Sequence, residues 1–297
     1  MSLMATLLSM HTQDEVRDQY LRAPMGYPGA KSRSIKFLLP HLPYRNTFVD
    51  VCCGTASVML ARNASPLDVY NDRHSGLVAF YRCIRDYEKC KKMIERIEIS
   101  PPLSREEFIW SRDTWKTDQI DDVERASRWY YSLVTSFNQK GWSFGRAVKG
   151  KGQGQKMFNN LKLFWPLHNR MRNAQIENQD WRMILKDYRK GGKDVVWYLD
   201  PPYWGTTGIY DHEWSINDHI ELCERVQDLD GGFVAVSGYD LPNHPYNNFK
   251  FWTDKVSWEV PISMTGIAFT ETNNLQAYEG DIKRGTATES LWIYNPT

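Results

Sequence analysis

The tetrapeptide Asp200-Pro201-Pro202-Tyr203 combines a carboxylate, two rigid residues and an aromatic ring. It ends the apolar segment 194–203, which predicts a buried strand, and open α/β sheets bind ligands at the carboxyl ends of their strands. Because prolines fix φ and lack an N–H, the turn is stiff and its carbonyls remain available as acceptors. The carboxylate and a carbonyl could accept both hydrogens of an aromatic amine while the ring stacks on the base, which would favour attack of the amine on a methyl group. Taken alone, the tetrapeptide is equally compatible with a structural turn in which the aspartate acts as a cap.

A second segment, 48–57, runs from an apolar stretch through Asp50, Cys52 and Gly54 towards a predicted helix. A strand, a turn of small residues and a helix N-terminus form a site for a nucleotide-like cofactor. The segment lacks a GxGxxG loop, so a pyrophosphate ligand is not favoured. Asp72 follows the next predicted strand, where an acid commonly accepts hydrogen bonds from ribose hydroxyls. The alternative is that Asp72 caps a helix.

A third segment, 27–32, places Tyr27, Gly29 and Lys31 before another predicted helix. Small residues followed by a lysine could receive a carboxylate. An ordinary loop that leads into a helix would have the same composition.

Basic residues gather in the glycine-rich segment 138–156, which we interpret as a loop. The formal net charge of the chain is only +1, so affinity for a polyanion would have to come from local patches of this kind. Trp142 and Phe144 lie among the basic residues and could stack or wedge, although a solvated surface is the alternative. The basic residues are Lys140, Arg146, Lys149, Lys151 and Lys156.

Alternating strand and helix patterns position these segments. We expect strands at 47–52, 67–71, 194–203, 232–239 and 289–295, a strand that leads into a helix at 174–181, and helices at 77–86, 124–137 and 216–229. This alternation predicts an α/β fold with a parallel, doubly wound sheet. Residues 87–174 show only helical patterns, so we expect a catalytic, cofactor-binding domain at 24–86 and 175–297, an inserted domain at 87–174 and an N-terminal extension at 1–23. The polar segment 265–288 is predicted to be a long loop.

Composition sets broader limits. The 297 residues are 41% hydrophobic and 25% charged, which is typical of a globular protein. Five cysteines without CxxC spacing indicate a reducing compartment, and seven histidines without metal-ligand spacing argue against a metal site. No apolar run reaches the ~18 residues of a membrane span, and the first 18 residues lack the basic region of a secretory signal. We therefore expect a cytoplasmic protein without membrane or metal partners.

In content and order, these segments resemble the Dam-type, alpha-group DNA adenine-N6 methyltransferases from about Met25 to the end of the chain. Residues 130–146 look like the recognition segment of that family, and residues 289–296 look like its final strand. Asp180 and Trp181 stand where the family has an Asp-Phe pair against the adenine of the cofactor. Two small departures are Ala30 and Ala56, which stand where the family has glycine.

The resemblance implies a Rossmann-like S-adenosyl-L-methionine-dependent methyltransferase fold with a mostly parallel sheet, an antiparallel final hairpin and an inserted, mainly helical target-recognition domain. It implies methyl transfer to the N6 amine of an adenine flipped out of double-stranded DNA, as in restriction-modification systems. Asp200 would hold and polarise N6, Tyr203 would stack on the base, and Asn138 would read bases. The phosphate contacts would be Lys140, Arg146, Lys149 and Lys151, and the cofactor-binding residues would be Tyr27, Gly29, Lys31, Asp50, Cys52, Gly54, Asp72, Asp180 and Trp181.

Two alternatives stay open at this point. Another amine could be the target, such as cytosine N4, adenine in RNA or a glutamine amide. The aspartate at the first position of the tetrapeptide, however, favours adenine. A catalytically weak, DNA-binding relative is the other alternative, favoured by Ala30 and Ala56 and disfavoured by the intact segment 200–203.

Overall fold

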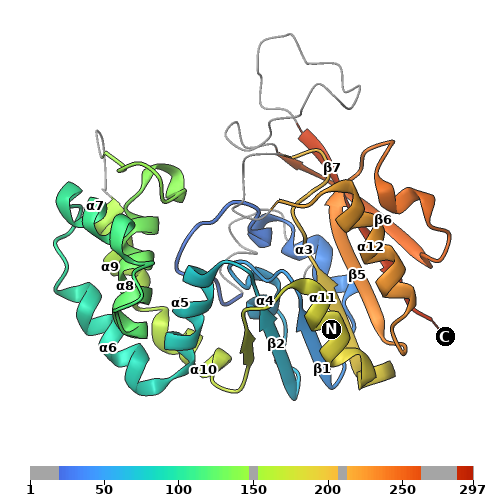
Figure 1. Ribbon diagram of the computed structural model, residues 1–297, viewed down its shortest axis with the longest axis horizontal. Coiled ribbons are helices and arrows are strands. Elements are labelled where there is room, and N and C mark those ends of the chain that lie inside the picture. The colour runs from blue at the N-terminus through green and yellow to red at the C-terminus, as the bar shows by residue number, and fades with distance from the viewer. Residues whose placement is uncertain (1–19, 147–152, 207–212, 262–285, 297) are drawn as a thin grey trace, which may run out of the picture.

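The computed structural model describes residues 20–146, 153–206, 213–261 and 286–296. Its centre is a seven-stranded sheet with the order β3-β2-β1-β4-β5-β7-β6 (Figure 1). The first five strands are parallel, and β7 lies antiparallel between β5 and β6. The Rossmann-like fold, the mostly parallel sheet and the antiparallel final pair are therefore confirmed. The strands are β1 (Thr47–Asp50), β2 (Leu67–Asn71), β3 (Gln175–Glu177), β4 (Val195–Leu199), β5 (Phe233–Tyr239), β6 (Asp254–Pro261) and β7 (Thr286–Tyr294).

Helices cover both faces of the sheet because side chains alternate between the faces along each strand. In β1, Phe48 belongs to one apolar core and Val49 to the other. The first core packs against α5 and the helices that follow it, whereas the second packs against α11 and α12. The helices beside the sheet are α3 (Ile35–Leu38), α4 (Ser57–Ala61), α5 (Ser75–Arg85), α11 (Trp181–Tyr188) and α12 (Ile216–Gln227), with short 3-10 turns that include η1 (Lys31–Arg33) and η2 (Leu39–His41).

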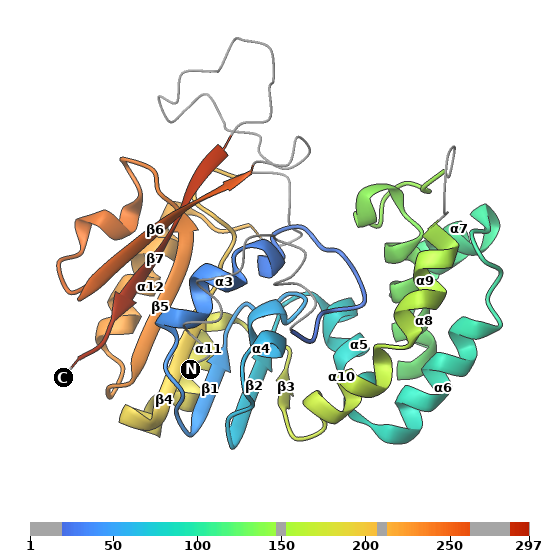
Figure 2. The same cartoon turned by 180° about the vertical axis from the view of Figure 1, so that it is seen from behind.

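A group of helices separates β2 from β3 in the chain. Figures 1 and 2 show α6–α9 gathered at one end of the molecule, with β6 and β7 at the opposite end. At Gly76 in α5, an added Cβ would lie 2.3 Å from the Trp129 ring in α8, so glycine permits this close helix contact. The group consists of α6 (Tyr87–Glu98), α7 (Arg105–Thr114), α8 (Asp122–Val134), α9 (Gln153–Leu161) and α10 (Phe164–Met171).

Arg170 in α10 also ties this group to the sheet. Its guanidinium donates to Asp68 Oδ2 and to the Met59 carbonyl, at 2.7 Å in each case. Asp68 is almost fully buried and also lies 3.9 Å from Arg62 Nη1, so two arginines compensate its charge.

The sequence expectations need three corrections. β6 was not predicted, although Val256, Trp258 and Val260 alternate with polar residues in its segment. Lys156 lies in α9 rather than in a loop, and residues 286–288 belong to β7. Lys149, Lys151 and the remainder of the 265–288 segment lie outside the described residues.

The first residues of the basic segment 138–156 belong to a closed turn, residues 136–144, which we call the 136–144 loop. An antiparallel bridge joins Ser136 to Phe144, and the Phe137 N–H donates to the Ser143 carbonyl at 2.7 Å. Within the loop, Asn138 has a positive φ of 52°, a conformation in which asparagine is enriched.

Candidate active site

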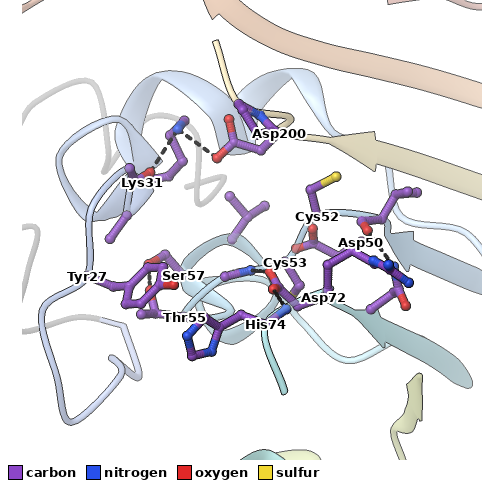
Figure 3. Close-up of a pocket in the computed structure, with 18 of the residues that line it drawn as sticks. Tyr27, Lys31, Asp50, Cys52, Cys53, Thr55, Ser57, Asp72, His74 and Asp200 are labelled. Atoms are coloured by element: carbon purple, nitrogen blue, oxygen red, sulfur yellow. Dashed lines mark hydrogen bonds and ion pairs between the residues drawn. The ribbon is translucent and has the colours of Figure 1, made fainter. Parts of the chain in front are cut away.

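A pocket opens where the carboxyl ends of β1, β2 and β4 meet. The strand order reverses direction between β1 and β4, and open α/β sheets bind ligands at such a switch point. Figure 3 shows Lys31 and Asp200 on one side of this pocket and Asp72 and His74 on another. The lining includes Tyr27, Gly29, Lys31, Asp50, Cys52, Gly54, Asp72, His74, Trp181, Asp200, Pro202 and Trp214. Most of the predicted cofactor residues are therefore brought together, whereas Asp180 is not in the lining.

The turn after β1 leaves room for a ligand. Gly54 has a positive φ of 53°, and nothing lies within 4 Å of the position that a Cβ would take. Ala56 has a φ of 58°, a left-handed conformation that costs a non-glycine residue about 1–2 kcal/mol. Glycine at position 56, which the resemblance leads one to expect, would avoid this strain.

Asp72 stabilises the same turn. Its carboxylate accepts hydrogen bonds from the Gly54 N–H at 2.8 Å and the His74 N–H at 2.7 Å. The residue that caps α5 is His74, whose ring accepts from the Leu77 N–H. The capping role considered for Asp72 is therefore wrong, and its carboxylate is held in the pocket lining.

Asp200 has two side-chain partners. Lys31 Nζ lies 2.6 Å from Asp200 Oδ2, and the Ser237 hydroxyl donates to Asp200 Oδ1 at 2.7 Å. Burial raises the pKa of the Asp200 carboxyl, while the Lys31 ammonium and the Ser237 hydroxyl oppose that shift. Ser237, in β5, was not predicted, and nothing local in its sequence separates it from other core serines.

Tyr203 is buried beside Asp200. Its ring packs edge-to-face on Tyr239, with the ring centroids 4.8 Å apart. Lys31 Nζ lies over the Tyr203 ring, 4.6 Å from its centroid. Pro202 lines the pocket, and Pro201 is buried next to it.

Two tryptophans form another wall. The Trp181 and Trp214 rings have centroids 4.8 Å apart and an interplanar angle of 32°. Trp181 begins α11, and the side chain of Asp180 caps that helix through the Arg182 N–H. Trp214 was missed, although a lone tryptophan in the polar stretch before α12 was a usable signal.

The predicted DNA-contact residues lie apart from the pocket lining, in and beside the 136–144 loop. Asn138 and Arg146 are exposed, and Lys140 is half-buried near the Trp142 ring. Phe137 and Trp142 are 58% and 63% exposed, so their rings are available for contacts.

The loop is also connected to other parts of the molecule. Phe144 packs against Phe108 and Arg105 rather than projecting from the loop. The buried Gln139 side chain accepts a hydrogen bond from the Gly26 N–H, which links the loop to the segment that holds Lys31.

Within the ranges that the structure describes, no cluster of three or more His, Cys, Asp or Glu side chains could hold a metal ion. None of the described helices is long and apolar enough to cross a membrane.

Comparison with known families identifies residues 27–265 as a match to the D12 class N6 adenine-specific DNA methyltransferases. The chain belongs to this family. The Dam-type enzymes form a subtype of it, so the resemblance seen in the sequence is confirmed. This D12-class protein is an enzyme that methylates the N6 amine of adenine in DNA, and the reaction requires a methyl donor. The pocket lining runs from Tyr27 to Trp214 and falls entirely within the matched range.

Curated relatives carry consistent names. The D12-class chain is 28% identical over 231 residues to the Type II methyltransferase M1.LlaDCHI of Lactococcus lactis subsp. cremoris, across 69% of this chain and 78% of that protein. It is 23% identical over 243 residues to the modification methylase StsI of Streptococcus sanguinis, across 76% of this chain and 36% of that protein. The similarity to StsI therefore covers only part of that longer protein.

Proposed function

We propose that this methyltransferase uses S-adenosyl-L-methionine to methylate an adenine flipped out of double-stranded DNA. The observation that supports this best is the single pocket that joins the ends of β1, β2 and β4. It places Asp50, Asp72 and Asp200 around one space together with aromatic rings. The cofactor would supply an electrophilic methyl group, and the residues of the chain would bind and orient both reactants.

The side of the pocket near Asp72 fits the cofactor. The open space above Gly54 admits a ligand close to the backbone. The Asp72 carboxylate would accept from ribose hydroxyls, and Trp181 and Trp214 offer apolar rings for a purine. Asp50 Oδ1 is buried and has no hydrogen-bond partner among the described residues. We assign cofactor binding to Tyr27, Gly29, Lys31, Asp50, Cys52, Gly54, Asp72, Asp180 and Trp181, and we add Trp214.

The side near Asp200 fits the target base. A base must leave the helix before its amine can be reached, because a stacked base is not accessible to the enzyme. Asp200 and a carbonyl of Pro201 or Pro202 would accept the two N6 hydrogens, while the Tyr203 ring contacts the base. Ser237 would orient the Asp200 carboxylate, since it donates to Oδ1. Oδ2, which contacts Lys31, would receive the amine.

The 136–144 loop would contact the duplex. Asn138 would read bases, and Lys140 and Arg146 would bind phosphates, continued by Lys149 and Lys151 in the adjoining segment. This assignment makes 87–174 a target-recognition domain inserted between the catalytic parts 24–86 and 175–297, with 1–23 as an extension. We further propose a cytoplasmic enzyme that provides the modification activity of a restriction-modification system, in agreement with the names of its relatives.

Methylation of a mixed-sequence plasmid with labelled S-adenosyl-L-methionine tests this proposal directly. We expect N6-methyladenine at one fixed sequence context after digestion and mapping. Label on cytosine, or no preference for DNA over RNA, would contradict it.

Asp200→Ala provides the control for the target role. Transfer should fall by about 100-fold or more, as when a positioned polar group is removed from an active site. Cofactor affinity should stay within a few-fold in calorimetry, because Asp200 is assigned to the target and not to the cofactor. Near-normal turnover would remove Asp200 from this role.

A further inference from the structure

The Lys31 ammonium makes three contacts in the structure. It lies 2.6 Å from Asp200 Oδ2, donates to the Gly29 carbonyl at 2.9 Å and lies over the Tyr203 ring at 4.6 Å from its centroid. The Lys31 side chain is 7% exposed, so water cannot replace these partners without a structural change.

Two of these contacts are the ones assigned to the target adenine. The adenine amine would donate to Asp200, and its ring would stack on Tyr203. Stacked aromatic rings have centroids about 4.5–7 Å apart, so an ammonium 4.6 Å above Tyr203 stands within the space of a stacked base. The base and Lys31 therefore compete for one site.

The charge of Lys31 determines what can displace it. A buried ammonium that loses its carboxylate partner is strongly unfavourable. Adenine is neutral and cannot compensate Lys31, whereas a carboxylate can. The pocket lining includes Lys31 together with Gly54 and Asp72, so a ligand on the cofactor side can reach the same ammonium.

We propose that Lys31 competes for the target-amine site and is drawn away from it by the carboxylate of the bound cofactor, so that the cofactor must bind before adenine can enter. This inference rests on the proposed function. It makes Lys31 a positioning residue that couples the two ligands of one pocket.

Binding of a dye-labelled duplex containing the mapped methylation site tests the coupling without any turnover. Its dissociation constant is measured alone, with S-adenosylhomocysteine, and with 5′-methylthioadenosine, which has the nucleoside but no carboxylate. The same duplex with an abasic target position is the reference, since no base can enter the pocket. We expect S-adenosylhomocysteine to tighten binding of the adenine duplex, relative to the abasic one, by about tenfold. Methylthioadenosine should change this ratio less than twofold. Equal effects of the two compounds, or no effect of either, would overturn the proposal.

Lys31→Met removes the ammonium from the pocket. The control is Lys36→Met, which removes an ammonium that contacts the Phe37 ring. We expect Lys31→Met to bind the adenine duplex as tightly without S-adenosylhomocysteine as the wild type does with it, and to bind S-adenosylhomocysteine at least tenfold more weakly. Lys36→Met should behave as the wild type. Unchanged coupling in a folded Lys31→Met variant would overturn the proposal, and the wild-type comparison decides the matter if that variant does not fold.

This test and the test of the proposed function fail separately. If the plasmid carries N6-methyladenine and Asp200→Ala is inactive while the coupling is absent, the ordered binding is wrong and the proposed function stands. If no methyladenine is formed, the proposed function fails first.

Discussion

Asp72 and Asp200 directly follow β2 and β4, two strands of the same sheet, but the surroundings of the two carboxylates differ. Asp72 accepts from two backbone amides, which fix its orientation. Asp200 is buried against side chains, and burial raises the pKa of its carboxyl. The first arrangement suits an acceptor for hydroxyl groups, and the second suits a carboxylate held in place by Lys31 and Ser237 beside the target base.

Asp72→Ala should therefore weaken cofactor binding more than it lowers turnover at saturating cofactor. Loss of hydrogen bonds to a charged acceptor corresponds to roughly 1.5–3 kcal/mol, or about 10- to 150-fold in the dissociation constant. Calorimetry with S-adenosylhomocysteine measures this change.

Asp86→Ala is a matched control for Asp72→Ala. Asp86 is exposed and caps α6 by accepting from the Lys89 N–H, so its loss removes a similar backbone contact away from the pocket. Its cofactor affinity should equal that of the wild type. An unchanged constant for Asp72→Ala would restrict Asp72 to a structural role in the turn.

At the scale of elements, the 136–144 loop joins the proposed DNA surface to the active site. Its outer side presents Phe137, Asn138 and Trp142, which are exposed. Its inner side holds Gln139, which is bonded to Gly26. A change in the loop on DNA binding would therefore alter its contact with Gly26, in the segment that leads to Lys31.

A double variant with Lys140→Ala and Arg146→Ala should weaken binding to any duplex and flatten its salt dependence. Each phosphate contact contributes roughly 0.9 to the slope of log affinity against log salt, so the slope should decrease by about two if both side chains contact phosphate. Fluorescence anisotropy across a salt series provides the measurement. Lys91→Ala with Lys92→Ala removes the same charge from exposed positions in α6 and should leave the slope unchanged. Equal slopes for both double variants would place the phosphate contacts elsewhere.

At the scale of the whole molecule, a polar cluster lies inside the second core. His219 Nδ1 is 2.9 Å from the Tyr246 hydroxyl, and the rings of His219 and His244 have centroids 5.9 Å apart. The Nε2 atoms of both histidines are buried without partners among the described residues. Burial lowers the pKa of His219 to about 4 and that of His244 to about 3.

The folded protein should therefore lose stability as the pH falls below about 6.5, the ordinary histidine pKa. Above that pH both states are neutral at these positions and the stability is fully present. Between pH 6.5 and about 4 the unfolded chain binds protons that the folded His219 does not, so the free energy of unfolding decreases by a few kcal/mol.

Urea denaturation at several pH values measures this decrease. His219→Gln should reduce it and leave the contribution of His244, whereas His41→Gln, at a half-buried histidine in η2, should leave it as in the wild type. A wild-type curve that stays level down to pH 4 would contradict the assignment.

Much of the fold and site could be predicted because the relevant patterns are local. Apolar runs followed by small or polar residues placed the ends of β1, β2 and β4 within a few residues, and those ends hold Asp50, Asp72 and Asp200. Since parallel strands end at one edge, their side chains had to be neighbours.

Other features depended on the tertiary structure. The Lys31–Asp200 ion pair, the Ser237–Asp200 bond and the Trp181–Trp214 contact join positions from 33 to 169 residues apart in the chain. A residue's own neighbours in sequence do not specify such partners, because strand order and side-chain direction decide them. The sequence by itself determined that a lysine, a carboxylate and an aromatic ring would stand near one sheet edge. Only the folded chain decided that the lysine pairs with the carboxylate proposed to bind the substrate, because the fold brings Lys31 to the end of β4, where Asp200 lies.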